Sequence, residues 1–147
     1  MSASKKIEAP TLSEFEAAEI IVRNVANETP VLRSNALSEL TGLEVILKAE
    51  NLQRTGAYKL RGAYHLMSKL TPAQRRKGVV AASAGNHAQG VALAAKKLGI
   101  KATIFMPVGA SLPKFEATKH YGAEVVLVGS VFAETLEAAL AYAAKKG

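Results

Sequence analysis

The 147-residue sequence contains no cysteine, which removes several classes of protein from consideration. Without cysteine there is no disulfide framework, no thiol nucleophile and no cysteine-based metal site. No apolar run approaches the roughly 20 residues that a helix needs to cross a bilayer. Residues 1–15 also lack the apolar block of a secretory signal peptide. The sequence therefore predicts a cytoplasmic protein with no membrane partner.

Aromatic residues are scarce as well, at 5% of the chain against 49% for all apolar residues. The core must therefore be built from Ala, Val, Leu and Ile. A length of 147 residues leaves room for one domain with a real core. Small and branched aliphatic side chains suit helices that pack closely on a parallel sheet. Composition thus favours the α/β class.

Acidic residues are outnumbered, 12 against 19 Lys and Arg, and the formal net charge is +7. The basic residues form short clusters at Lys5-Lys6, Arg75–Lys77, Lys96-Lys97 and Lys145-Lys146. Aromatic residues do not interleave with these clusters as a stacking surface for nucleic acid requires. Most clusters fall near predicted helix C-termini, where cations offset the helix dipole. We therefore predict no nucleic-acid partner, although an anionic substrate or cofactor would also favour a positive field.

Turn residues and periodicity divide the chain into alternating elements. We expect a mobile arm up to Pro10 and an extended piece at residues 29–32. The predicted helices cover residues 11–27, 34–40, 59–70, 72–77, 87–98, 113–121 and 130–146. The predicted strands cover residues 43–49, 78–82, 101–105 and 124–128.

From Leu43 onward strands alternate with helices, which predicts a parallel sheet with right-handed crossovers. Ligands in such sheets bind beyond the carboxyl ends of the strands. Lys59 and Asn86 each lie in a segment that follows a predicted strand. We therefore expect both to open onto the same edge of that sheet.

Lys59 stands between a turn of small residues, Thr55–Ala57, and an amphipathic helix. A lysine at such a junction is held by rigid structure and can still point into a cleft. Partial desolvation there makes a lysine amine reactive toward carbonyl groups. The alternative is a solvated lysine in a first helical turn, which spacing alone favours because lysines are mostly exposed.

Residues 83–87, Ser-Ala-Gly-Asn-His, form a small-residue turn that leads from a strand into a helix. Such a turn directs several backbone N–H groups to one point and can bind an anion. The alternative is an ordinary turn in which Asn86 is the helix N-cap. His87 at a helix start is more often a packing or hydrogen-bonding residue, and we assign it no proton transfer.

Three stretches together resemble the N-terminal part of the threonine dehydratases, or threonine deaminases: Glu50–Tyr64, Ala81–Gly90 and Met106–Gly122. These are pyridoxal-phosphate enzymes of the tryptophan-synthase-β fold type. The resemblance runs from about Thr29 to the C-terminus. It implies an α/β fold with a parallel sheet flanked by helices. It also favours a functional role over the structural alternative both at Lys59 and at residues 83–87.

The resemblance implies a role for each motif residue. Lys59 would form the Schiff base with pyridoxal 5′-phosphate and act as the catalytic amine, because lysine is the usual partner of this cofactor. Asn86 would donate to the oxygen of the cofactor's ring hydroxyl, and Tyr58 would pack beside the ring. Residues Ser83, Ala84, Gly85, Asn86 and His87 would hold the substrate carboxylate. No metal site is implied.

Position 84 bears on the type of reaction. In the related serine racemases a serine stands there and acts as acid and base on the face opposite the lysine. Ala84 has no proton to exchange. The resemblance therefore favours elimination of water from threonine or serine over racemisation.

Other features of the family are absent from this sequence, including the glycine-rich loop for the cofactor phosphate. We expect residues 1–42 to belong to a missing larger domain and residues 43–147 to form the smaller α/β domain. The chain is then a fragment that binds the cofactor poorly on its own. Pro113, Lys114 and Lys119 match the family and are assigned structural roles. Arg61 could meet an anion, but we expect it to be an exposed helix residue. A homo-oligomer is expected, and a non-catalytic binding or oligomerisation module is the alternative to an enzyme.

Overall fold

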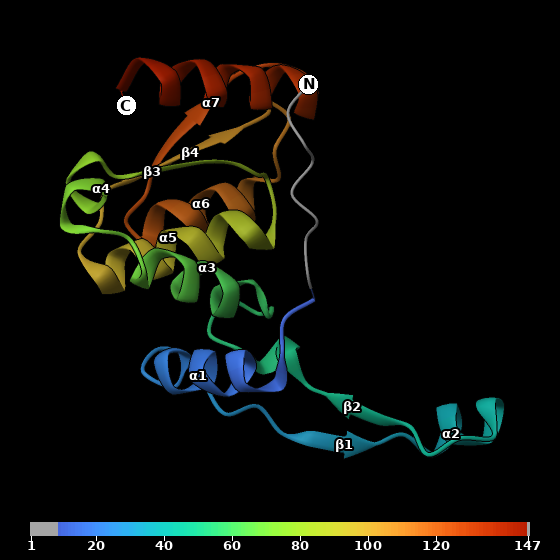
Figure 1. The fold of residues 1–147 in the computed structure, drawn as a ribbon. Coiled ribbons are helices and arrows are strands. Elements are labelled where there is room, and N and C mark those ends of the chain that lie inside the picture. Colours follow the sequence, from blue (N-terminus) through green and yellow to red (C-terminus); the bar gives the residue numbers. More distant parts are fainter. Residues whose placement is uncertain (1–8, 147) are drawn as a thin grey trace, which may run out of the picture.

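A computed structural model describes residues 9–146 and contains a three-stranded parallel sheet with helices on both faces (Figure 1). The strands are β3 (Val79–Ala82), β4 (Ala102–Met106) and β5 (Glu124–Leu127), in the order β3-β4-β5. Each lies parallel to its neighbour, with Val79 opposite Ala102 and Ile104 opposite Val125. The predicted α/β class is confirmed. Most of the predicted N-terminal arm, including Lys5-Lys6, lies outside the described residues.

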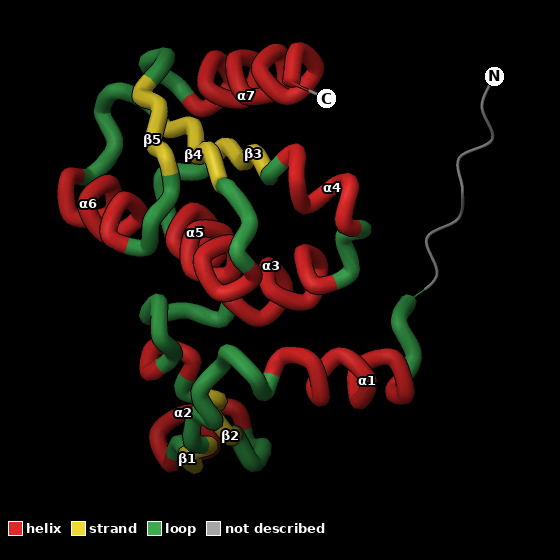
Figure 2. Tube along the Cα trace, turned by 90° about the vertical axis from the view of Figure 1, so that its left-hand side faces the viewer, coloured by secondary structure: helices red, strands yellow, loops and turns green. Residues whose placement is uncertain are grey.

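The helices divide between the two faces of this sheet (Figure 2). On one face α5 (Asn86–Leu98) packs on β3 and β4, α6 (Leu112–His120) packs beside it on β5, and α3 (Lys59–Ser68) covers α5 from outside. On the other face α7 (Phe132–Lys146) packs on β3 and β4. Every residue of β4 is buried, as expected for a central strand covered from both sides.

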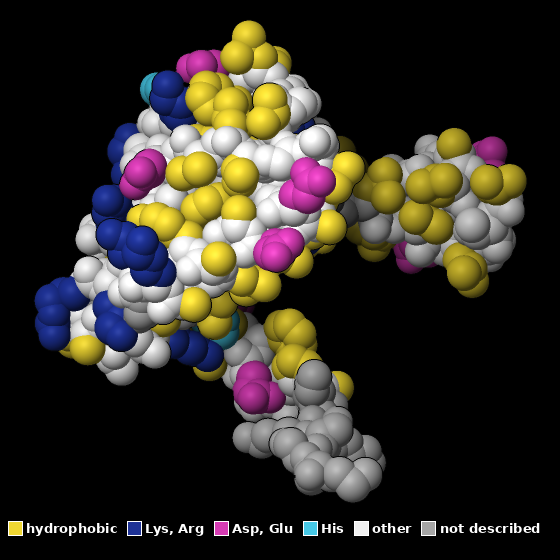
Figure 3. All heavy atoms as spheres, turned by 90° about the horizontal axis from the view of Figure 1, so that it is seen from above, with side chains coloured by type: hydrophobic (Ala, Val, Ile, Leu, Met, Phe, Trp, Pro, Cys, Tyr) yellow, Lys and Arg dark blue, Asp and Glu magenta, His cyan; other side chains and the backbone are white. Residues whose placement is uncertain are grey.

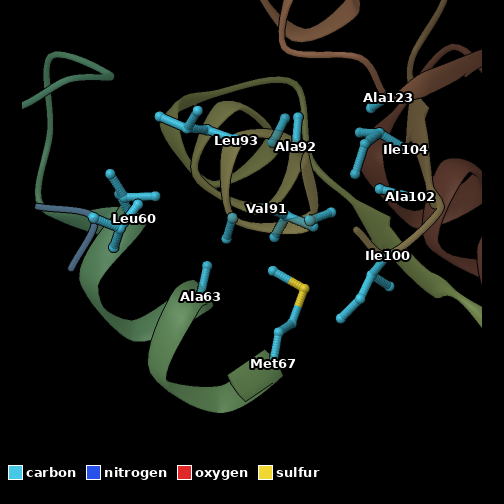
Figure 4. Packing of buried hydrophobic residues seen from close by; sticks show 14 of the residues in the cluster. Leu60, Ala63, Met67, Val91, Ala92, Leu93, Ile100, Ala102, Ile104 and Ala123 are labelled. Atoms are coloured by element: carbon cyan, nitrogen blue, oxygen red, sulfur yellow. The ribbon is translucent and has the colours of Figure 1, made fainter. Parts of the chain in front are cut away.

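The core lies mainly between α3 and α5 (Figure 4). Leu60, Ala63 and Met67 recur at helical spacing on α3 and are all buried. They face α5, where the run from Val91 to Ala95 is buried throughout. The small alanine side chains let the two helices approach closely, so this composition places α5 between α3 and the sheet.

Local sequence signals set many of the helix ends. Thr11 and Glu14 form a capping box before α1 (Leu12–Val22), and Thr71 and Gln74 form another before α4 (Pro72–Lys77). The helix α2 (Asn35–Thr41) ends at Gly42, whose φ of 69° is in the left-handed region that glycine adopts readily. The predicted basic clusters of the described residues lie in the last turns of α4, α5 and α7. Figure 3 shows Lys and Arg side chains gathered along one side of the molecule.

The predicted strand 43–49 does not belong to the parallel sheet, and that prediction was wrong. The observed strand β2 (Ile46–Lys48) pairs antiparallel with β1 (Val31–Arg33) in a separate two-stranded sheet. This pair and α2 extend away from the parallel sheet (Figure 1). The helix between the two strands, α2, buries no residue, so it does not cover the sheet as the crossover helix of a parallel pair does. Both strands are exposed on both faces.

The first helix also ends earlier than predicted, at Val22 instead of Asn27. The buried side chain of Gln53 explains part of the difference. Its Oε1 accepts from the Asn27 N–H at 2.8 Å, and its Nε2 donates to the Asn27 carbonyl at 3.0 Å. These contacts satisfy the Asn27 backbone from 26 residues away, outside any helix. Within residues 9–146 no helix is long and apolar enough to cross a bilayer.

Candidate active site

Lys59 is the first residue of α3, and the N-cap Tyr58 separates it from the turn formed by Thr55, Gly56 and Ala57. Thr55 and Ala57 are buried, and Gly56 has a φ of 66°, which makes a sharp turn possible without a side-chain clash. Lys59 is half-buried, and its Nζ lies 4.5 Å from the centre of the Tyr58 ring. The Tyr58 side chain is exposed, so one face of the ring remains accessible.

The turn from Ser83 to Gly85 connects β3 to α5, and the helix begins at Asn86. Gly85 is the N-cap, so the alternative in which Asn86 caps the helix was wrong. In other helices the N-caps Thr11, Ser34 and Thr71 accept a hydrogen bond through their side chains. Gly85 has no side chain that could accept one.

The first turn of α5 therefore has spare hydrogen-bonding capacity. The Ser83 hydroxyl accepts from the Gly85 N–H at 3.2 Å. In the described part of the chain we find no acceptor for the N–H groups of Asn86, His87 and Ala88. Unpaired N–H groups and the positive end of the helix dipole make this turn a suitable place for an anion.

Gly90 brings these two segments together. A Cβ added to Gly90 would lie 2.9 Å from the Lys59 carbonyl carbon, 3.0 Å from the Leu60 nitrogen and 3.2 Å from the Lys59 Cβ. The backbone of α5 therefore touches the backbone of α3 at Lys59, one helical turn after Asn86. Since β2 lies outside the parallel sheet, the two segments do not share a strand edge as predicted. Helix packing through a glycine places them side by side.

The electrostatics of His87 also connect the two segments. Partial desolvation lowers the pKa of the His87 imidazole below its usual 6.5, and the positive charge of Lys59 lowers it further. His87 is therefore neutral at pH 7. The charge of Lys59 therefore acts on a side chain in the first turn of α5.

Arg61 was predicted to be exposed, and that prediction was wrong. Its Nε donates to Glu50 Oε2 at 2.9 Å and its Nη2 donates to Glu50 Oε1 at 2.7 Å. The Thr29 hydroxyl donates to the same carboxylate at 2.6 Å. The Arg61 hydrogen bonds, followed by that of Thr29, lower the pKa of Glu50 to about 2. This cluster ties the segment before Lys59 to α3 two residues after it.

No simple sequence pattern points to the Arg61–Glu50 pair. The two residues are 11 positions apart, with a 3₁₀ turn and an irregular loop between them. Neither helical nor strand spacing relates them. No group of three or more metal-binding side chains occurs among residues 9–146.

Comparison with known proteins identifies the family. The model of a family described as "Pyridoxal-phosphate dependent enzyme" matches residues 22–147. The chain belongs to this family of pyridoxal-phosphate-dependent enzymes. It is 51% identical over 137 residues to an L-threonine ammonia-lyase of Thermotoga maritima, covering 93% of this chain and 34% of that protein.

Solved structures of family members are similar across nearly all of the chain. A threonine deaminase isoform of Solanum lycopersicum matches with a TM-score of 0.81 and 39% identity, covering 97% of this chain and 40% of that one. A maize serine racemase matches with a TM-score of 0.86 and 32% identity, covering 95% and 43%. The chain spans about a third of the length of the curated relatives it matches, at 34–36%.

The described residues fit the cofactor of this pyridoxal-phosphate family. An aldehyde requires a primary amine, and Lys59, whose backbone touches α5, carries one. A ring oxygen requires a donor, and Asn86 stands exposed on the first turn of that helix, with its side-chain amide free of protein partners in residues 9–146. The unpaired N–H groups beside it suit the carboxylate of an amino acid.

Proposed function

We propose that this chain carries the lysine and the carboxylate site of a threonine or serine dehydratase. The single observation that supports this most strongly is the Gly90 contact. It sets the backbone of Lys59 against α5, one turn from the uncapped N–H groups. A reactive amine and an anion site at this spacing suit a substrate that is both an amine and a carboxylate.

Three side chains would hold pyridoxal phosphate. Lys59 would bond to the aldehyde carbon, the Asn86 amide would donate to the ring hydroxyl oxygen, and the Tyr58 ring would pack beside the cofactor. When bound, the cofactor supplies an electron sink for the charge left on the substrate α-carbon.

The other steps depend on residues of this chain. Backbone donors of Ser83, Ala84, Gly85, Asn86 and His87 would hold the substrate carboxylate. The freed Lys59 amine would then take the α-proton, and the β-hydroxyl would leave with a proton as water. Hydrolysis of the released enamine gives a 2-oxo acid and ammonia. His87, neutral at pH 7, would hold position without transferring a proton.

Racemisation is the second candidate, supported by the similarity to maize serine racemase. A two-base racemase needs a proton donor on the side of the substrate opposite Lys59. Ala84 occupies the position where the related racemases have serine, and its methyl group cannot exchange a proton. We therefore favour elimination.

We also propose that residues 1–42 and 43–147 belong to different domains of a longer protein, and that this protein is a cytoplasmic homo-oligomer. Apolar side chains are exposed on α7 and on the arm formed by β1, α2 and β2, as Figure 3 shows. Leu40, Leu43 and Leu140 are among the most exposed of these side chains. Surfaces of this kind are usually covered by other protein. Light scattering on the longer protein would test the oligomeric state.

A chimera tests the dehydratase function directly. The chain would replace the matching 34% of the Thermotoga maritima relative, and 2-oxo acid formed from threonine and serine would be measured. We expect activity that Lys59→Ala abolishes and that Lys69→Ala, at the exposed end of the same helix, leaves intact. Borohydride trapping of pyridoxal phosphate on Lys59, located by peptide mass spectrometry, gives a readout that does not depend on turnover.

Two results would contradict this proposal. Full activity in the Lys59→Ala chimera would remove the catalytic role of this lysine. Conversion of L-serine to D-serine faster than 2-oxo acid formation, followed by chiral chromatography, would favour the racemase instead.

A further inference from the structure

Lys114 lies beside the Ser83–Gly85 turn, although the two segments are distant in the sequence. A Cβ placed on Gly85 would be 3.9 Å from the Lys114 Nζ. Lys114 belongs to the first turn of α6, which follows β4, and the Ser83–Gly85 turn follows the neighbouring strand β3. Both segments therefore emerge at the carboxyl edge of adjacent parallel strands.

Nothing in its local surroundings accounts for a cation at this position. The first turn of a helix favours acidic side chains because its end of the dipole is positive, so a lysine there is unfavourable. Lys114 is half-buried, and no ion pair or side-chain hydrogen bond of its ammonium occurs within residues 9–146. By contrast, Lys119 is exposed in the last turn of α6, where the dipole favours a cation.

An ammonium without a counter-ion is stabilised when an anion binds next to it. The unpaired N–H groups at the start of α5 follow directly after Gly85, beside which the Lys114 ammonium lies. Those groups and Lys114 would act on the same ligand, the N–H groups by direct hydrogen bonds and Lys114 by charge. The lysine charge would not increase the binding affinity of a neutral compound of the same shape.

We propose that Lys114 is a specificity-determining residue that selects ligands with a carboxylate at the Ser83–His87 turn. The inference rests on the proposed function, since it assigns a further residue to the site that would hold the substrate carboxylate. It departs from the structural role expected of Lys114 from the sequence.

The test uses amide NMR of the 147-residue chain, without cofactor. Propionate is titrated at constant ionic strength, and propionamide serves as its neutral isostere. We expect propionate, but not propionamide, to shift the amide resonances of residues 83–88. Lys114→Gln should weaken propionate binding about tenfold, as the loss of a charged contact does. Lys114→Arg should retain most of the affinity.

Lys119→Gln is the matched control, because it removes the same charge from the same helix and should leave propionate binding unchanged. The spectrum itself reports whether each variant folds, and Lys114→Met supplies a second uncharged variant if the glutamine variant does not. Equal propionate affinity in the Lys114→Gln and Lys119→Gln variants would overturn the role of Lys114 and leave the proposed function intact. Absence of any propionate effect on residues 83–88 in the unaltered chain would overturn both this inference and the proposed carboxylate site.

Discussion

Replacing Gly90 with alanine tests the contact that places Lys59 beside α5. The new methyl group would lie 2.9 Å from the Lys59 carbonyl carbon and 3.0 Å from the Leu60 nitrogen. These are backbone atoms in a helix, so they cannot turn aside as the end of a flexible side chain can. To relieve the overlap, α3 and α5 must move apart along their shared core.

Two opposing effects determine how much the Gly90→Ala substitution changes the free energy of unfolding. Alanine in place of glycine in a helix interior stabilises by about 1 kcal/mol. Forcing an extra methyl group into a packed core costs about 1–3 kcal/mol. The net result for Gly90→Ala is a loss of up to about 2 kcal/mol in the free energy of unfolding.

Gly62 provides the matched control. It lies in the interior of α3, is exposed, and a Cβ there meets nothing within 4 Å. Gly62→Ala should therefore stabilise the protein by about 1 kcal/mol. The difference between the two alanine variants cancels the helix preference and reports the contact alone, at about 1–3 kcal/mol.

Urea unfolding followed by circular dichroism measures this difference. With a slope of about 1–3 kcal/mol per molar urea, the midpoint for Gly90→Ala should lie about 1 M below that for Gly62→Ala. Equal midpoints for the two variants would show that α5 does not approach Lys59 as closely as the structure indicates. The proposed site would then lose its strongest support.

Three further predictions concern charged groups. A double-mutant cycle of Glu50→Gln and Arg61→Gln should give a coupling of about 1–2 kcal/mol in urea unfolding, and additive effects would contradict the ion pair. Folding lowers the pKa of Glu50 from 4.5 to about 2, so its stabilising contribution is complete above pH 4.5 and is lost as the pH falls toward 2. The unfolding free energy of Glu50→Gln should therefore fall less over this range; parallel pH profiles would argue against the shift. Lys59→Gln should raise the pKa of His87, measured by NMR of the imidazole C–H signals, while desolvation keeps it below 6.5. An unchanged pKa would mean that Lys59 points away from α5.

Much of the secondary structure could be predicted because its causes are local. The capping boxes at Thr11 and Thr71 connect residues only three positions apart, and Gly42 ends α2 through its own φ angle. The buried face of α3 follows from helical spacing alone. A pattern within four residues records such causes completely, so the sequence determined these elements. The alternation of strands and helices after Gly78 also indicated parallel strands.

The tertiary structure decided which segments meet. The strand near Leu47 was recognised, but its antiparallel partner β1 depends on how the chain returns through α2. Gln53 holds the Asn27 backbone outside α1 by binding it across the fold, and the pairing of Arg61 with Glu50 depends on the course of the loop between them.

In the candidate site, too, the sequence identifies the residue types, whereas the tertiary structure sets the distances between them. The residue types at Lys59 and in the Ser83–His87 turn can be recognised in the sequence, since each chemical group belongs to one residue. Their spacing depends on Gly90, where the lack of a side chain allows two helix backbones to touch. The position of Lys114 beside Gly85 depends in turn on two neighbouring strands ending at one edge of the sheet. Distances between separate elements arise from packing over the whole domain, and no local pattern contains them.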